Sequence, residues 1–509
     1  MTPAWLDIAV VALYFTVLGG LCLCGMHRYT MVWLYWRNRK NTPKPKGTFA
    51  ELPRVTVQLP IFNEMYVCER LIDAVCALDY PRDRMEIQVL DDSTDETVEI
   101  SRKKVAEMRA LGHDITWIHR TDRTGYKAGA LAHGLRSSTA DFVAVFDADF
   151  LPNPDFLKST VHFFTDPGIG MVQARWEHIN RDGSSLTQIQ AIMLDGHFVV
   201  EHTARHRGGR FFNFNGTAGI WRRRAIEDGG GWEHDTLTED LDLSYRAQLR
   251  GWRFVYLKDL ASPSELPADI NAFKTQQHRW AKGGVQTALK LLPSIWSAKI
   301  PWSVKFEATH HLGNYASFLG MVLMCLLILP SMIARRDLGW LQSMKWADAI
   351  VFMGAFASVL VFYGTSQIAL GGNWLRRFLM FPLMLAVGVG MCLNNAKAVL
   401  EALMGHQTGF VRTPKHGLGA GAVQLAGKKY RGRSNVLAVV EFLFGIYFTC
   451  VCAIAAHFEM WGSLPFLALF PIGFFYVSGL SFAQAFGARK KNLTETTVTA
   501  EKAEPAAAR

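Results

Sequence analysis

Long uncharged apolar runs lie near the start of the chain and in its second half, separated by a stretch of mixed polar and apolar residues. The first run extends from Ile8 to Met26, and about 20 apolar residues are enough to cross a bilayer. Comparable runs follow residue 311, at Leu312 to Ile333, Ala349 to Leu370, Val436 to Ala456 and Leu464 to Phe486. We therefore expect five membrane-spanning helices.

The segment 378–403 is also apolar, but it contains polar and helix-breaking residues, namely Pro382, Asn394, Asn395, Lys397 and Glu401. If it crossed the membrane, the basic loop 405–434 would lie on the outer side, against the positive-inside bias. We therefore interpret 378–403 as an interfacial or re-entrant segment, with six spans as the alternative.

The first apolar run lacks the basic start and small-residue cleavage site of a secretory signal, so it predicts an uncleaved anchor. Basic residues follow it at once, at Arg28, Arg37, Arg39, Lys40, Lys44 and Lys46. This bias places the next part of the chain in the cytoplasm and the amino terminus outside.

The mixed stretch alternates between two periodicities. Arg54 to Pro60 and Glu86 to Leu90 are predicted strands, and each is followed by an amphipathic helical pattern. Alternating strands and helices indicate a parallel, Rossmann-like α/β sheet, which binds ligands at the carboxyl ends of its strands. Acids stand at these ends, in Asp91-Asp92 and again in Asp147-Ala-Asp149.

Composition supports a membrane protein with a soluble domain. The 509 residues are 50% hydrophobic and 19% charged, with a formal net charge of +10. Because the basic residues cluster beside apolar runs, anionic lipid headgroups explain them better than nucleic acid, and we expect no nucleic-acid partner. The 8 cysteines include no Cys-X-X-Cys pair, which argues against a zinc site or a disulfide framework.

Three motifs carry chemistry that phosphate and sugar ligands require. Asp147 and Asp149 suit a divalent cation, Mg²⁺ or Mn²⁺, that keeps coordination sites open for phosphate oxygens. Arg279 can grip phosphate oxygens bidentately, and the neighbouring Trp280 offers a face for a sugar ring. Asp240 could accept a proton from an attacking hydroxyl.

The order Asp, Asp-X-Asp, Thr-Glu-Asp and Gln-X-X-Arg-Trp resembles the membrane-embedded family 2 glycosyltransferases, such as cellulose synthase and the cellulose-synthase-like mannan synthases. Here the four motifs are Asp91-Asp92, Asp147/Asp149, Thr238 to Asp240 and Gln276 to Trp280. The resemblance extends from about Pro53 to Lys415. It implies an α/β GT-A-like catalytic domain plus an all-α transmembrane region.

The resemblance also implies a role for each matching residue. Asp240 would be the catalytic base, and Asp149 with Asp147 the metal site. The nucleotide sugar would contact Asn63, Glu64, Asp91, Asp92, Lys127, Asp147, Gln276 and Arg279, and the acceptor would contact Asn215, Gly216, Thr217, Glu239 and Trp280. A gating loop would present Phe410, Arg412, Thr413 and Lys415, although Arg412 replaces the valine of the cellulose synthase pattern.

The function implied is a processive inverting transferase that builds a β-linked, glucan- or mannan-like polysaccharide at the cytoplasmic face of a bacterial inner membrane and exports it. The expected partners are a nucleotide sugar (UDP-glucose or GDP-mannose), the growing glycan and the lipid bilayer, and accessory export subunits are compatible with this reading. A non-processive glycolipid synthase is the alternative, and a non-catalytic sugar-binding or transport protein is a third reading.

These interpretations divide the chain into an anchor with its basic segment (1–46), a glycosyltransferase domain (47–282), interfacial helices (283–311), a second membrane region (312–487) and a disordered tail (488–509). His202 and His206 lie four residues apart, as many metal-ligating pairs do on helices. Without a companion Glu-X-X-His motif, we interpret them as an ordinary helical face.

Overall fold

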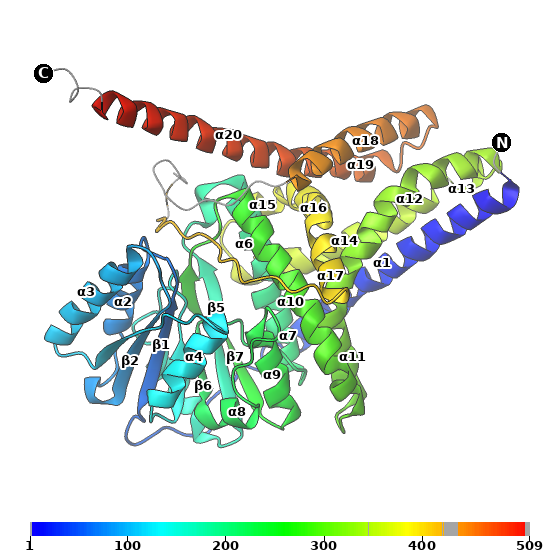
Figure 1. The fold of residues 1–509 in the computed structure, drawn as a ribbon. Coiled ribbons are helices and arrows are strands. Elements are labelled where there is room, and N and C mark those ends of the chain that lie inside the picture. The colour runs from blue at the N-terminus through cyan, green and yellow to red at the C-terminus, as the bar shows by residue number, and fades with distance from the viewer. Residues whose placement is uncertain (1–2, 345, 420, 422–435, 504–509) are drawn as a thin grey trace, which may run out of the picture.

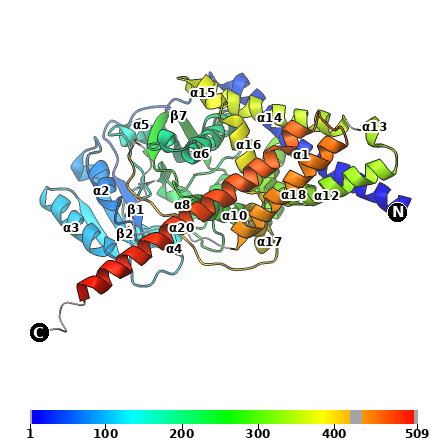
Figure 2. The same ribbon diagram turned by 90° about the horizontal axis from the view of Figure 1, so that it is seen from above.

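A computed structural model describes residues 3–344, 346–419, 421 and 436–503. Its α/β part contains all the strands and packs against a layer of long helices (Figure 1). Seen from above, α1 (Ala4–Asn38), α12 (Ser317–Asp337) and α14 (Ala347–Leu370) lie to one side of the sheet, while α18 (Leu437–His457) and α20 (Leu469–Ala503) pass over the top (Figure 2).

One mixed sheet of seven strands has the order β3-β2-β1-β4-β6-β5-β7. β6 runs antiparallel to both of its neighbours, and the other pairs are parallel. The strands are β1 (Val55–Ile61), β2 (Met85–Asp91), β3 (Ile115–His119), β4 (Phe142–Val145), β5 (Ile169–His178), β6 (Gly219–Arg222) and β7 (Arg253–Ser264). The predicted Rossmann-like domain is confirmed.

Both faces of the sheet are covered, which explains why β4 is apolar on both sides, with Phe142 and Ala144 in one core and Val143 and Val145 in the other. One face packs on α2 (Cys68–Cys76) and α3 (Thr97–Ala110), through residues such as Leu71 and Val105. The other packs on α4 (Tyr126–Ser137), α8 (Arg223–Asp228) and α9 (Glu239–Leu249), through residues such as Leu131 and Leu243. Because β1 pairs in parallel with both β2 and β4, the carboxyl ends of these three strands meet at one edge of the domain.

Five helices of the described chain are long and apolar enough to cross a membrane, as predicted. The predicted interfacial segment forms the pair Trp374–Gly390 and Cys392–Leu403, bent by 41°, which would raise the number to six if it counted as one span. Within this pair lie α15 (Trp374–Phe378), α16 (Phe381–Gly390) and α17 (Cys392–Leu403). Shorter helices are α5 (Phe156–Val161), α6 (Ser185–Asp195), the π-helix η4 (Gly196–Glu201), α7 (His202–Arg207), α13 (Leu341–Met344) and α19 (Leu464–Leu467).

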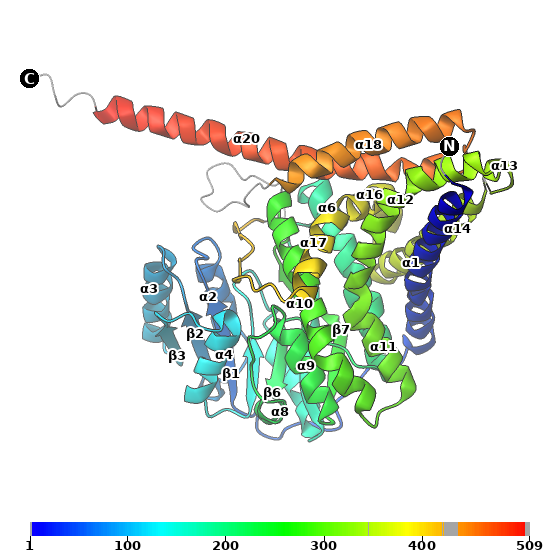
Figure 3. The ribbon, with the colours of Figure 1, turned by 45° about the vertical axis from the view of Figure 1, so that its right-hand side comes forward.

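Helices α10 (Ile270–Ser297) and α11 (Trp302–Gly313) form a hairpin between the two parts of the molecule (Figure 3). Trp296, Trp302 and Phe306 pack together near its tip, and Trp302 is 65% exposed. Such an exposed aromatic cluster fits the predicted interfacial location. Helix α10 continues through residue 282, so the predicted boundary at 282/283 falls inside this helix.

Helix α10 also reaches into the membrane region. The ammonium of Lys274 donates to Oε2 of Glu441 on α18 at 2.5 Å and to the hydroxyl of Ser481 on α20 at 2.9 Å. All three side chains are buried. An ionisable pair inside a membrane region is costly unless its members satisfy each other.

The carboxy-terminal part differs from its prediction. Helix α20 continues to Ala503, so residues 488–503 are helical where the sequence predicted a disordered tail. Alanine, glutamate and lysine in this segment favour helix, which accounts for the difference. Residues 504–509 and, in and just after the predicted gating loop 405–434, residues 420 and 422–435 lie outside the described residues.

Candidate active site

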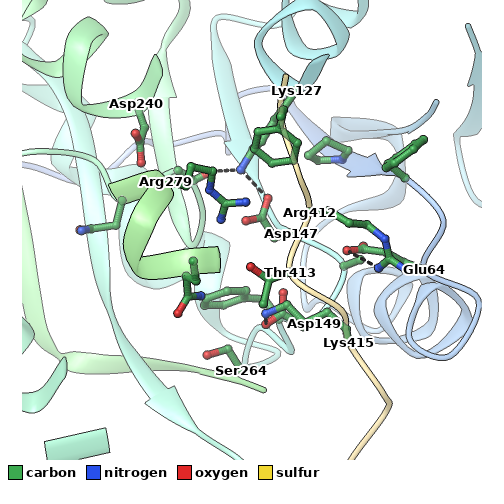
Figure 4. Close-up of a pocket in the computed structure, with 18 of the residues that line it drawn as sticks. Glu64, Lys127, Asp147, Asp149, Asp240, Ser264, Arg279, Arg412, Thr413 and Lys415 are labelled. Carbon is green, nitrogen blue, oxygen red and sulfur yellow. Dashed lines mark hydrogen bonds and ion pairs between the residues drawn. The ribbon is translucent and has the colours of Figure 1, made fainter. Parts of the chain in front are cut away.

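A cavity of about 190 Å³ opens at the carboxyl edge of the sheet, between the α/β domain, α10 and the segment after α17 (Figure 4). The predicted site residues that line it are Glu64, Asp92, Lys127, Asp147, Asp149, Asn215, Gly216, Glu239, Asp240, Gln276, Arg279, Trp280, Phe410, Arg412, Thr413 and Lys415. Residues far apart in the sequence therefore share one cavity.

The two acids after β4 are each paired with a lysine. Oδ1 of Asp147 accepts from the ammonium of Lys127 at 2.5 Å, and Oδ2 of Asp149 accepts from Lys415 at 2.6 Å. Asp149 is the more buried of the two, with 6% of its side chain exposed against 35% for Asp147. Both carboxylates therefore already present oxygen atoms to positive charge.

Lys127, at the start of α4, links the acid pair to the segment before β6. Besides Asp147, its ammonium donates to the carbonyl oxygen of Gly216 at 2.9 Å. Burial by itself would lower the pKa of Lys127. The carboxylates of Asp147 and Glu239 raise this pKa by more than burial lowers it, so the net shift is upward. The side chain carries a fixed positive charge in the middle of the cavity.

Glu239 and Asp240 begin α9 and face this charge. Burial raises the pKa of Asp240, and the nearby Glu239 carboxylate raises it further. Gly216 borders the same carboxylate, because a Cβ there would lie 3.0 Å from Oδ2 of Asp240. A carboxyl group with a raised pKa can accept a proton more readily than an ordinary aspartate.

Helix α10 supplies Gln276, Arg279 and Trp280 from one face. Nη1 of Arg279 donates to the carbonyl oxygen of Val411 at 3.2 Å, and its guanidinium lies 4.6 Å from the centre of the Phe410 ring. Arg279 is thus held against the predicted gating loop.

The segment 404–418 crosses the mouth of the cavity. In addition to the Lys415 contact, Arg412 lies 3.8 Å from Oε1 of Glu64. Burial raises the pKa of Glu64 to about 8, against the opposing charge of Arg412. The backbone N–H groups of His416 and Leu418 donate to the two oxygens of buried Glu265, at 2.8 and 2.9 Å. Glu265 fixes the far end of the segment.

At the other end of the cavity, Arg123 lines the wall and Arg120 binds the lining residue Asp92 from behind. Arg120 follows β3 and makes two bonds to the Asp92 carboxylate, from Nε at 2.8 Å and from Nη2 at 2.5 Å. The guanidinium of Arg123 lies 3.2 Å from the centre of the Phe62 ring. A flat, partly cationic surface beside a carboxylate suits a nucleobase.

Three residues predicted to contact ligands do not line the cavity. Asp91 is fully buried and accepts from Ser101 Oγ at 2.6 Å and Trp117 Nε1 at 3.1 Å. Asn63 has a φ of 53° and accepts from the N–H of Thr94, at 2.8 Å. The hydroxyl of Thr217 accepts from the N–H of Asp147 at 2.9 Å. Each of them supports a residue or turn beside the cavity.

Sequence reasoning missed Arg120, Arg123 and Glu265. A signal existed for the two arginines, because Arg120 directly follows a strand and Arg123 precedes the motif that contains Lys127. Nothing local marks Glu265, since its role depends on a segment 151 residues later in the chain.

A second group of acids, Glu233, Asp235 and Asp242, has the spacing of a metal site. The ammonium of Lys290 already lies among them, at 2.5, 2.8 and 3.1 Å. This cluster is therefore balanced by a lysine and lies apart from the residues that line the cavity.

Comparison with known proteins gives consistent matches. Residues 53–283 match the family model described as "Glycosyltransferase like family 2". The chain is 36% identical over 455 residues to the probable glucomannan 4-beta-mannosyltransferase 9 of Oryza sativa, covering 86% of this chain and 82% of the relative. It is 42% identical over 310 residues to glucomannan 4-beta-mannosyltransferase 2 of Arabidopsis thaliana, covering 58% of each chain. The match to glucomannan 4-beta-mannosyltransferase 1 of Oryza sativa covers 49% of each chain, so the chain spans about half the length of this relative and of the Arabidopsis thaliana protein.

Among solved structures, the chain is similar to the mannosyltransferase PcManGT from Pyrobaculum calidifontis, in complex with GDP-Man and Mn²⁺. The TM-score is 0.49 at 21% identity, covering 78% of this chain and all of that one. The curated relatives quoted are plant proteins, so the predicted bacterial inner membrane receives no support from them.

Proposed function

Because the chain belongs to the family 2 glycosyltransferases, we propose that it is a processive inverting transferase that builds a β-linked polysaccharide from a nucleotide sugar. One observation supports this most directly. Asp240, the acid pair Asp147/Asp149, Arg279 and Trp280 line a single cavity directly beside the helical region. On the names of the relatives, we propose GDP-mannose as the donor and a mannan-like chain as the product.

In this proposal Asp240 is the base. The acceptor hydroxyl attacks the anomeric carbon of the donor, and its proton passes to the Asp240 carboxylate as the bond to the diphosphate breaks. A single displacement inverts the anomeric configuration. Trp280 stacks on the terminal acceptor sugar, and Gly216 leaves room for that sugar beside Asp240.

The leaving diphosphate needs positive charge. Lys127 and Arg279 stand within the cavity, and Arg412 and Lys415 enter it from the segment 404–418. Fixed cations in a site that excludes water stabilise a developing negative charge more strongly than cations in bulk solvent. Closure of the segment over the donor would complete this set.

A divalent cation, Mg²⁺ or Mn²⁺, fits the Asp147/Asp149 pair. The two residues present carboxylate oxygens to one cavity, and hard oxygen ligands suit either ion. When bound, such an ion neutralises the leaving group. Lys415, which contacts Asp149, would then be released toward the diphosphate.

We further propose that the catalytic cavity faces the cytoplasm and that the product leaves through the helical region. The basic residues that follow the first apolar run support this orientation. The segment 404–418 reaches the cavity, so it must lie on the same side of the membrane as the α/β domain.

A panel of labelled nucleotide sugars tests the function. Membranes containing the protein are incubated with GDP-mannose, UDP-glucose and related donors, and the products are sized. We expect a long β-linked product from GDP-mannose. A glycolipid would select the non-processive alternative, and the absence of any transfer would overturn the proposal.

Lys415→Ala tests the role of the segment. The substitution removes a charge-assisted contact, so we expect the KM for the nucleotide sugar to rise by about tenfold or more. The matched control is Lys397→Ala, an exposed lysine on α17 whose side chain is 59% accessible. Steady-state kinetics on both variants provide the measurement, and unchanged kinetics in Lys415→Ala would contradict a role in donor binding.

A further inference from the structure

Four side chains on one side of the cavity form a continuous hydrogen-bonded chain that the mechanism above does not use. Oε2 of Glu201 lies 2.9 Å from Nδ1 of His197, and Nε2 of the same ring lies 3.1 Å from Nδ2 of Asn215. Oδ1 of Asn215 lies 2.7 Å from Nε2 of His202. Of the four, Asn215 is the residue that lines the cavity.

Glu201 fixes the direction of this chain from one end. Burial alone would raise its pKa, but Arg205, whose Nη1 lies 3.2 Å away, keeps it well below the ordinary value. Because an ionised carboxylate can only accept, Nδ1 of His197 must carry the hydrogen. The amide nitrogen of Asn215, which can only donate, lies 3.1 Å from Nε2 of the same ring, so Nε2 accepts.

His202 fixes the other end. Burial holds its pKa well below the ordinary value, so the ring is neutral. Its Nδ1 is buried without a hydrogen-bond partner among the described residues, so the single ring hydrogen belongs on Nε2. That N–H donates to Oδ1 of Asn215. Both histidines therefore require the same orientation of the Asn215 side-chain amide, with Nδ2 toward His197 and Oδ1 toward His202.

The π-helix η4 makes this arrangement possible. In a regular α-helix, residues five apart point about 140° away from each other around the axis. In the wider π turn that precedes α7, the rings of His197 and His202 come together, with their centres 4.3 Å apart. π turns of this kind occur frequently at functional sites. The relevant partner of His202 is thus five residues before it, and not His206, four residues after it.

The hydrogen-bonded row of side chains is also held by contacts with helices outside the α/β domain. Nε of Arg205 donates to Oε1 of Glu307 on α11 at 2.9 Å, and the other oxygen of Glu307 lies 2.8 Å from Nε2 of His27 on α1. Glu201 is therefore held through Arg205 by groups on two further helices.

We propose that Glu201, His197 and His202 are positioning residues that lock the amide of Asn215 to read a hydroxyl of the acceptor sugar. One N–H and one lone pair of this amide remain for a ligand, and a sugar hydroxyl can use both. The next residue, Gly216, borders Asp240, where the acceptor must lose its proton. The inference rests on the proposed function and adds to it the groups that select the acceptor.

The test uses the purified full-length protein in lipid nanodiscs, with GDP-mannose as donor and β-1,4-linked mannohexaose as acceptor. Asn215→Asp keeps the shape but replaces the donating nitrogen with an oxygen that faces the lone pair of His197. We expect the KM for the hexaose to rise about tenfold, because the loss of one hydrogen bond has an effect of this size. The KM for GDP-mannose should stay unchanged.

His202 provides a second, separable test. His202→Phe keeps an aromatic ring but removes the N–H, so we expect a similar rise in the KM for the hexaose. In His202→Gln, the side-chain amide can donate from the position of Nε2, which should restore the KM. Tyr256→Phe is the matched packing control, because the Tyr256 ring lies 5.0 Å from that of His202 and its hydroxyl has no hydrogen-bond partner among the described residues.

The outcomes are distinguishable. An active wild-type protein whose Asn215→Asp and His202→Phe variants keep the KM for the hexaose within about twofold would overturn this inference and leave the proposed function intact. Equal losses for donor and acceptor in His202→Phe, not restored in His202→Gln, would indicate a purely structural role and also overturn it. A wild-type protein that uses no donor in the panel removes the proposed function, and this inference with it.

Discussion

Replacing Asp240 with Asn is expected to reduce kcat by about 100- to 10,000-fold, the usual contribution of a general base. The substitution keeps the shape of the side chain and removes its ability to take the acceptor proton. Donor binding should persist, because Lys127 and Arg279 remain in place. Isothermal titration with the nucleotide diphosphate and single-turnover transfer assays measure the two effects separately.

The pH profile provides an independent check. Burial and the neighbouring Glu239 raise the pKa of Asp240, and the base must be ionised to act. Transfer should therefore fall as the pH drops, along an acid limb well above the pKa of an ordinary aspartate. The amide introduced by Asp240→Asn cannot titrate, so the limb should vanish from the residual activity of that variant. Polymer yield near that of the wild type would refute the assignment of the base.

Replacing Asp149 with Ala is expected to lower transfer by about a thousandfold and to remove its dependence on Mg²⁺ or Mn²⁺, because metal stabilisation of a leaving diphosphate is worth several kcal/mol. Asp149 is the more buried acid of the pair and the partner of Lys415. Mn²⁺ binding in the presence of nucleotide, followed by electron paramagnetic resonance, gives a readout that does not require turnover.

Two comparisons sharpen this result. Asp149→Asn keeps the volume and loses the charge, so it should resemble Asp149→Ala if the charge is what matters. Glu233→Gln alters the other acidic cluster, which Lys290 already balances, and should leave Mn²⁺ binding unchanged. Full activity of the wild-type protein in EDTA would show that no metal is used.

Local patterns predicted strands β1 and β2 and the acid pair after β4, and the family motif predicted the cavity-lining residues of α10. These features depend on strand periodicity and on short motifs, which the sequence displays directly. Asp91 shows where such reasoning fails. Side chains alternate along a strand, so of two consecutive acids at the end of β2, Asp91 points into the core and Asp92 reaches the cavity.

Contacts between distant segments could not be predicted in this way. The bonds from Glu265 to the backbone of His416 and Leu418 join residues about 150 positions apart. The approach of His197 to His202 depends on a π turn, which no local pattern of residues marks. Such features arise from packing between elements, which overrides local preference.

The buried ion pair between Lys274 and Glu441 has a mechanical consequence. Lys274 lies on the same rigid helix as Arg279, so a tilt of α18 within the bilayer must either move this helix or separate the pair. Separating a buried pair costs about 3–5 kcal/mol, much more than thermal energy. If α18 spans the bilayer, as its length and composition predict, changes in bilayer thickness or lateral pressure that reorient α18 would be transmitted to the guanidinium of Arg279 in the cavity. The rate of sugar transfer should then depend on the composition of the lipid around the protein.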